Sequence, residues 1–389
     1  MLNNKWFRAA IPALLIHSCI GSVYCWSLLK ADIASLMECP VSSIEFAFSL
    51  AIFFLGMSAA FGGRFVEKNV TLATITSGLF FGAGLQVSIL AINFKDVNLL
   101  MLGYGCLMGV GLGIGYLSPV KTLMLWFSEH KGLATGIAIS GFGLSKVLFS
   151  PFIEWCNVAY GVKTTLALIC AISVVCIGLA ALLIKKPLHW KEPKTPFKIQ
   201  EYYRVLQNPT YIKIWIVFYL NITCGLALIA FEKSIAVDIG VGTAFIALLA
   251  SATAFFNTAG RFFYSMSSDY TQRKETIYKI IFASSLIVMA LASVSYTLVP
   301  VVVMLMTVNA GYGGGFSTLP TLLQSKFGME KISTIHGLAL SAWAWAGLSG
   351  NQLSNLLVNT LGLDYVVLFI VLAALYALSL GITYSIKKT

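Results

Sequence analysis

Charged residues are scarce in this sequence, and their scarcity excludes a soluble protein. Asp, Glu, Lys and Arg make up 11% of the 389 residues, whereas soluble domains contain about 25%. Hydrophobic residues reach 58%, and the mean hydropathy is +0.85. A soluble chain of this length could not cover its surface with so few charges. The composition therefore predicts an all-α integral membrane protein.

Acidic residues are fewer still, with 15 Asp and Glu against 26 Lys and Arg. A net charge of +11 would suit a nucleic-acid-binding protein if the basic residues gathered on one solvent-exposed face. Here they are spread over short segments between apolar runs, so we expect no nucleic-acid partner. The lipid bilayer is the expected surrounding.

Metal-binding and catalytic sequence motifs are also missing. The eight cysteines form no CxxC pair, and most lie inside apolar runs, so neither a zinc site nor a disulfide framework is indicated. The sequence contains no HExxH motif, no phosphate-binding loop and no nucleophile–base motif. We therefore expect no metal, no cofactor and no enzymatic activity.

What the sequence does contain is a series of apolar runs, each long enough to cross a membrane. A hydrocarbon core of about 30 Å needs roughly 20 apolar residues in a helix. Twelve such runs lie at 6–29, 45–66, 70–92, 98–125, 132–153, 164–184, 210–231, 243–266, 276–297, 299–323, 332–357 and 362–386. The polar stretch 185–209 divides them six plus six. The predicted domains are thus a helical bundle at 1–184, a cytoplasmic central loop at 185–209 and a second bundle at 210–389.

The distribution of basic residues predicts the orientation. If the N-terminus is cytoplasmic, 19 Lys and Arg lie in cytoplasmic segments and four in outer loops. This asymmetry follows the positive-inside rule, so both termini and the central loop are expected to be cytoplasmic. The three remaining basic residues, Lys121, Lys146 and Arg261, lie within predicted spans, whereas the acids lie in loops or near span ends. Buried cations without buried anions favour a negatively charged substrate.

The two halves of the chain resemble each other at an offset of 201 residues. The matching pairs are Gly113 and Gly314, Pro119 and Pro320, Glu129 and Glu330, Gly136 and Gly337, Ala138 and Ala339, and Ser140 and Ser341. Because each half has an even number of spans, the halves have the same orientation. Two parallel six-helix repeats are the construction of the major facilitator fold, which places a substrate cavity between the halves and works by alternating access.

Four motifs resemble one family of major facilitators. The first span carries GSVYCWS (21–27), and the fourth and fifth carry GLGIGYLSPVKTLMLWFSEHKGLATGIAISGFG (111–143). The eighth has Gly260-Arg261 followed by Ser268-Asp269, and the eleventh has HGLALSAWAWAGLSG (336–350). Together these resemble the oxalate/formate antiporter family, which is related to the monocarboxylate porters.

This resemblance implies transport of small carboxylates, with an arginine of the eighth span, here Arg261, holding the carboxylate. The family's oxalate exchanger also uses a lysine on the eleventh span, where this sequence has Trp343 and Trp345. That departure argues against oxalate itself. The facilitator signature after the second span is degraded to GRFVEK (63–68). The corresponding signature after the eighth span is better kept and includes Asp269 and Arg273.

Arg261 is the principal candidate for substrate binding. It lies about 10 Å inside its span at 1.5 Å per residue, and a guanidinium can hold a carboxylate through two parallel hydrogen bonds. Asn257 is one turn earlier on the same face, where it would contact the ligand or orient the arginine. The competing interpretation is an arginine that reaches to the lipid headgroups.

Lys146 lies about 22 Å along the fifth span, which matches the eleventh in the repeat. It would therefore replace the missing lysine and bracket a dianion together with Arg261. Alternatively it pairs outward along the stripe that Ser150 and Glu154 continue. His17, in the middle of the first span, is a candidate for carrying a coupling proton; a plain hydrogen bond within the bundle is the competing interpretation.

Aromatic residues are expected to wall a small cavity around the substrate, although they also fill helical bundles. The candidates are Tyr24, Tyr116, Phe142, Phe316, Trp343 and Trp345. Glycines at 105, 109 and 113, and again at 111 and 115, predict close helix packing in the fourth span. Glu129 and Lys131, with Asp269 and Arg273, are expected to form gate or loop contacts.

The sequence therefore predicts a secondary transporter of small carboxylates, of the formate, lactate or pyruvate type, in the cytoplasmic (inner) or plasma membrane. Coupling by exchange or by proton symport stays open, and we expect the chain to work as a monomer. One alternative is an oxalate-like dicarboxylate exchanger that uses Arg261 and Lys146. Another is a membrane sensor with the same fold that binds the ligand without transporting it.

Overall fold

The computed structural model describes residues 4–190 and 199–386, which form helices and turns without a strand. By their internal contacts these residues fall into two compact units. The first unit comprises Met1–Phe197 with Met329–Ala344, and the second comprises Lys198–Gly328 with Trp345–Thr389. Helix α13 (Ile332–Asn355) contributes residues to both units.

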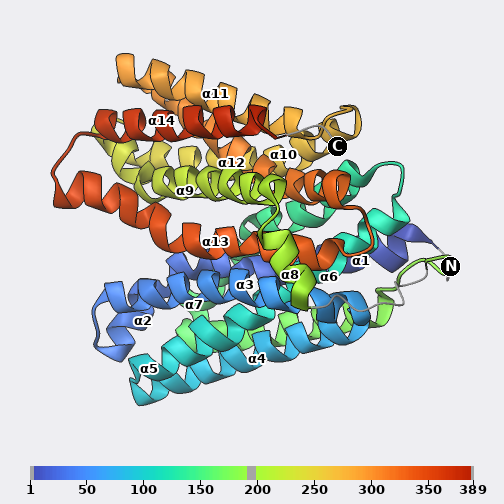
Figure 1. The fold of residues 1–389 in the computed structure, drawn as a ribbon. Coiled ribbons are helices and arrows are strands. Elements are labelled where there is room, and N and C mark those ends of the chain that lie inside the picture. Colours follow the sequence, from blue (N-terminus) through green and yellow to red (C-terminus); the bar gives the residue numbers. More distant parts are fainter. Residues whose placement is uncertain (1–3, 191–198, 387–389) are drawn as a thin grey trace. The chain divides into compact units, whose positions relative to one another are not determined.

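The first unit is built from the N-terminal helices. Their bounds are η1 Trp6–Ala10, α1 Ile11–Ile20, η2 Gly21–Cys25, α2 Trp26–Met37, α3 Val41–Lys68, α4 Val70–Phe94, α5 Val97–Leu100, η3 Met101–Met108, α6 Gly109–Trp126 and α7 Lys131–Leu183. Helix α7 packs against both α1 and α4, and α6 packs against both α3 and α4 (Figure 1). Gly161 breaks α7 with a φ of 77°, so α7 contains two spans.

The second unit is built from α8 to α14. The bounds are α8 Ile199–Leu206, α9 Pro209–Asp238, α10 Thr243–Asp269, α11 Glu275–Val294, α12 Leu298–Phe327, α13 as given above, η4 Leu356–Thr360 and α14 Tyr365–Tyr384. Helix α12 packs against α9, α10 and α11, and α14 packs against α9 and α11 (Figure 1). Helix α8 lies within the stretch that we predicted as loop, while residues 191–198 of that stretch fall outside the described residues.

The number of spans agrees with the sequence. Nine helices in the described residues are long and apolar enough to cross a membrane, and one of them is α7 with its two spans. Helices α10 and α13 have 27 and 24 residues, and a helix of either length crosses the roughly 30 Å of a bilayer core. The twelve predicted spans are therefore all present.

The first span is longer than predicted. We expected it to end at Leu29, but helix continues to Met37. Lys30 and other polar residues lower the hydropathy here, yet Leu29, Ile33 and Met37 lie on one helical face and are buried. The Lys30 Nζ forms a salt bridge with Glu45 Oε1 on α3 at 2.5 Å. This salt bridge ties the polar face of the segment to α3.

The glycines of the fourth span serve helix packing, as predicted. A Cβ at Gly109 or Gly113 would lie within 3 Å of α3, and one at Gly111 or Gly115 would lie as close to α4. Two glycine rows on one helix thus admit two neighbours at short distance. The same device recurs in the second unit, where a Cβ at Gly260 of α10 would lie 2.1 Å from the backbone oxygen of Ala310 on α12.

Candidate functional site

The strongest candidate in the second unit is Arg261, which is 1% exposed on α10. Its Nε donates a hydrogen bond to Asn257 Oδ1 at 3.0 Å. Its guanidinium carbon lies 5.3 Å from the centre of the Phe316 ring on α12, within the range of a cation–π contact. The predicted Arg261–Asn257 pair on one helical face is therefore present, and Phe316 completes it.

Glycine on α12 makes room for this pair. A Cβ at Gly313 would lie 2.1 Å from the backbone oxygen of Asn257 and 3.0 Å from Arg261 Cγ. Phe316 follows Gly313 by three residues and shares its face of α12. The close crossing of α10 and α12 thus brings the guanidinium onto the aromatic ring.

The electrostatics of the pair depend on Asn257 being neutral. A guanidinium stays protonated in proteins, so Arg261 brings a permanent charge into a buried position. The Asn257 amide orients the guanidinium without neutralising it. A buried guanidinium held this way is suited to bind a carboxylate, because the two groups form parallel, charge-assisted hydrogen bonds.

Four of the six aromatic candidates form one cluster in the first unit. Tyr116 contacts Phe142 at 5.6 Å and Trp343 at 5.5 Å between ring centres, and Phe142 contacts Tyr24 at 5.2 Å. These contacts are edge to face, the arrangement that aromatic rings favour. Tyr116, Phe142 and Trp343 are at most 1% exposed. In this structure they pack against one another.

The other two aromatic candidates belong to the second unit and differ from each other. Phe316 is buried beside Arg261 and contacts Phe218 of α9 at 5.1 Å. Trp345 is 51% exposed, although Trp343, two residues earlier, is buried. Two residues turn a helix by about 200°, so the two tryptophans point to opposite sides of α13.

His17 and Lys146 lie in contrasting surroundings in the first unit. His17 is fully buried, with its ring nitrogens beside the backbone oxygens of Ala138 and Tyr116. Lys146 is exposed on α7. Lys146 and Glu154 both lie within electrostatic range of the Cys25 thiol, so both follow the same side of α7.

The four loop candidates lie at helix ends. Glu129 is exposed in the turn before α7, and Lys131 is the first residue of α7. Asp269 is the last residue of α10, and Arg273 is exposed in the next turn.

Two residues outside these four loop candidates, Lys121 and Glu67, contact the start of α13. Lys121 is 1% exposed, and its Nζ donates to the backbone oxygen of Glu330 at 2.8 Å. Glu67 Oε1 accepts a hydrogen bond from the Thr334 amide at 3.1 Å. Glu67 therefore satisfies an amide in the first turn of α13, where helices leave N–H groups without internal partners.

We also predicted no site role for Asn221 or His336 from the sequence. Asn221 on α9 is fully buried, donates to the Gly311 backbone oxygen at 3.4 Å and has no hydrogen-bond partner for its Oδ1. His336 is 1% exposed, lies 6.2 Å from the Tyr116 ring, and its Nε2 has no partner either. A lone amide or imidazole within an apolar run is the signal that would have identified them.

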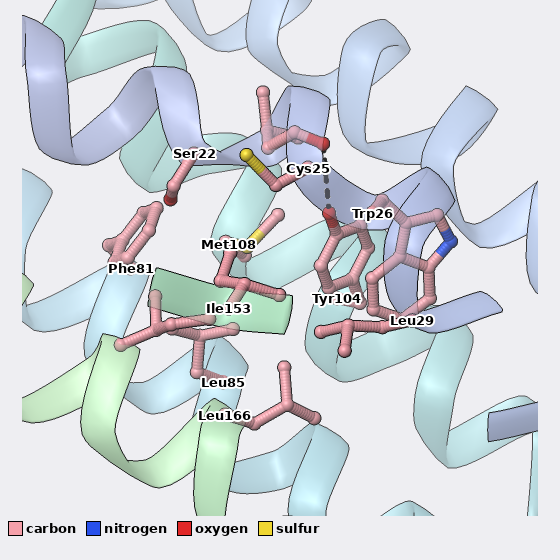
Figure 2. A pocket seen from close by; sticks show the side chains of 12 residues that line it. Ser22, Cys25, Trp26, Leu29, Phe81, Leu85, Tyr104, Met108, Ile153 and Leu166 are labelled. Carbon is pink, nitrogen blue, oxygen red and sulfur yellow. Dashed lines mark hydrogen bonds between the residues drawn. The ribbon is translucent and has the colours of Figure 1, made fainter. Parts of the chain in front are cut away.

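A small cavity lies within the first unit, away from these residues (Figure 2). Its volume of about 20 Å³ suits a single water, and its lining is mostly apolar. Tyr104 donates a hydrogen bond across it to the Val23 backbone oxygen at 3.3 Å, as Figure 2 shows. Val23 belongs to η2, so this hydrogen bond supports the tightened turn of the first span.

Comparison with known proteins places the chain in a family. A family model described as Major Facilitator Superfamily matches residues 10–351. The oxalate:formate antiporter of Oxalobacter formigenes is 24% identical over 386 residues, which cover 98% of this chain and 91% of that protein. Monocarboxylate transporter 13 of Bos taurus is 23% identical over 193 residues, 49% of this chain and 44% of its own.

A solved structure shows the same fold. The crystal structure of FucP, a Major Facilitator Superfamily transporter in the outward conformation, aligns with a TM-score of 0.74 at 14% identity, over 99% of this chain and 100% of that one. The fold and the family resemblance predicted from the sequence are thereby confirmed. This multi-pass membrane protein belongs to the Major Facilitator Superfamily of transporters.

Proposed function

We propose that this transporter moves a small carboxylate anion, a monocarboxylate of the formate, lactate or pyruvate type, by alternating access. The observation that carries the proposal is Arg261, a buried guanidinium oriented by the neutral amide of Asn257. A carboxylate matches the guanidinium in shape and in charge. Relatives that include an oxalate:formate antiporter and a monocarboxylate transporter support this substrate class.

The choice of a monocarboxylate follows from the number of cations. Arg261 is the one cation that we place at the substrate, and one guanidinium neutralises one carboxylate. We further propose that the protein transports and does not catalyse, that it works as a monomer, and that it resides in the cytoplasmic or plasma membrane. The excess of basic residues on one side supports cytoplasmic termini; residues 1–3 and 387–389 lie outside the described residues.

Uptake into proteoliposomes tests the proposal. Labelled formate, lactate, pyruvate and oxalate would be offered to purified protein, with and without internal carboxylate and a pH gradient. We expect saturable uptake of at least one monocarboxylate, with dependence on the internal anion for exchange or on the gradient for symport. Binding without uptake would favour a sensor, and neither binding nor uptake by folded protein would exclude this substrate class.

Replacing Asn257 by aspartate should weaken carboxylate binding. The new carboxylate would stand 3.0 Å from Arg261 Nε and compete with the substrate for the guanidinium. We expect KM to rise about 10- to 100-fold, which corresponds to about 1.4–2.8 kcal/mol. A KM in Asn257→Asp equal to that of the native protein at every pH would contradict the pairing.

Lys146 decides between monocarboxylate and dicarboxylate transport. If Arg261 alone holds the substrate, Lys146→Ala should leave the KM for formate and lactate within about twofold, since exposed charges contribute little. If a dianion is bracketed by both cations, the same variant should lower oxalate affinity about tenfold or more, a loss of about 1.4 kcal/mol. Competition by oxalate against labelled formate measures this, and an unchanged oxalate affinity removes the dicarboxylate alternative.

A further inference from the structure

The ring of His17 lies between two backbone carbonyls that come from different helices. Its Nε2 is 3.0 Å from the oxygen of Tyr116 on α6, and its Nδ1 is in close contact with the oxygen of Ala138 on α7. The side chain is 0% exposed. A carbonyl oxygen only accepts hydrogen bonds, so each nitrogen satisfies its neighbour only by carrying a hydrogen.

A neutral imidazole carries one N–H and leaves the lone pair of the other nitrogen facing a carbonyl oxygen. An imidazolium carries two N–H groups and donates to both carbonyls. The surroundings of His17 therefore suit the protonated ring. We propose that His17 binds the proton that this transporter moves together with its carboxylate substrate, an inference that rests on the proposed function.

Aromatic and titratable groups from α6, α7 and α13 lie around His17. On α6 its ring lies 5.1 Å from the ring of Tyr116, and on α7 it lies 6.3 Å from that of Phe142. His336 of α13 lies within electrostatic range. Cys19 of α1 interacts with Cys176 of α7, and Lys121 of α6 bonds the Glu330 carbonyl. The other titratable residues of α7 are Lys131, Lys146, Glu154, Cys156, Tyr160, Lys163 and Cys170.

Glu154, the acidic residue of α7, lies 16 residues beyond Ala138, which is about 24 Å along a helix at 1.5 Å per residue. The transported carboxylate carries one negative charge, and a proton that travels with it compensates that charge. One proton adds to the lone pair of a ring nitrogen when one carboxylate binds, and both leave on the other side of the membrane. No net charge crosses in this cycle, which is electroneutral symport.

The test compares the native protein with His17→Gln in proteoliposomes. Glutamine keeps an N–H donor but binds no proton in this range. His17→Phe, which keeps a ring but binds no proton, is a second variant in case glutamine does not fold. His189→Gln at an exposed position is the matched control. Uptake driven by a pH gradient, proton entry reported by an enclosed dye, and exchange at equal pH are measured for each protein.

We expect His17→Gln to lose about tenfold or more of gradient-driven lactate uptake and of proton entry, because histidine is the side chain that titrates near neutral pH. Exchange should stay within about threefold, since Arg261 still binds the carboxylate. His189→Gln should behave as the native protein does. Gradient-driven uptake and proton entry that persist in both His17 variants would overturn the proposal, as would their loss in His336→Gln alone.

The two hypotheses fail in different ways. A native protein that exchanges carboxylates without moving protons overturns the role of His17 and leaves the proposed function intact. A native protein that moves no carboxylate overturns the proposed function, and proton binding is then read from thermal unfolding in detergent. Relative to His17→Gln, the native protein should gain stability on acidification from about pH 8 to pH 5. Identical pH profiles would show that His17 binds no proton.

Discussion

Arg261→Gln is expected to lower carboxylate uptake by about 30- to 1000-fold. Truncating one partner of a buried, hydrogen-bonded charge pair costs about 2–4 kcal/mol, and each 1.4 kcal/mol is a factor of ten. Glutamine is close to arginine in its first carbons, so the packing around Gly313 is kept while the charge is lost. Initial rates in proteoliposomes at several substrate concentrations separate a rise in KM from a fall in the maximal rate.

Two further variants show whether the shape of the guanidinium matters as well as its charge. Arg261→Lys keeps the positive charge but loses the planar fork and the hydrogen bond to Asn257. We expect carboxylate uptake by Arg261→Lys to be about tenfold lower than that of the native protein, a smaller loss than in Arg261→Gln. Arg204→Gln, at an exposed position of α8, should have no effect. Native uptake by folded Arg261→Gln would contradict a binding role for this arginine.

The helical spans were predictable because they depend on averages over some twenty residues. Exchanging a few apolar residues for others in such a run leaves its hydropathy the same, and the predicted and observed bounds agree within a few residues for most helices. The largest difference is the segment after Leu29, where a helix with one polar face has a low mean hydropathy. Its buried side, Ile33 and Met37, is visible in the sequence only as a periodicity.

The pairing of Arg261 with Asn257 was also predictable, since residues four apart on a helix are always neighbours. Contacts between helices were not. Whether Trp343 or Trp345 is buried depends on how α13 is rotated about its axis. The neighbours of His17 are backbone carbonyls, which every residue has, so the sequence does not indicate which ones lie beside it. The role of Gly313 likewise appears only once α10 and α12 are placed side by side.

Gly313→Ala is expected to have the second large effect, because Gly313 lies where α10 and α12 cross. The added Cβ would lie 2.1 Å from the backbone oxygen of Asn257, far inside the usual separation of about 3.3–3.6 Å between carbon and oxygen. Because the obstacle is backbone, it cannot rotate away, so α10 and α12 must separate by about 1 Å. A shift of that size can reduce an activity about 100-fold when it displaces a positioned group, and here it moves Arg261 relative to Phe316.

Gly381→Ala on α14 provides the matched comparison, because a Cβ there meets no atom within 4 Å. Overpacking typically costs about 1–3 kcal/mol, so Gly313→Ala should unfold at a lower temperature and transport poorly. Gly381→Ala should transport normally and unfold at the same or a higher temperature, since alanine favours helix over glycine by about 1 kcal/mol. Thermal unfolding and uptake are measured on the same preparations.

If Gly313→Ala matched the native protein in both measurements, the close approach of α10 and α12 would not be what positions Arg261. A variant that kept its stability but lost transport would instead show that the crossing serves the site more than the fold.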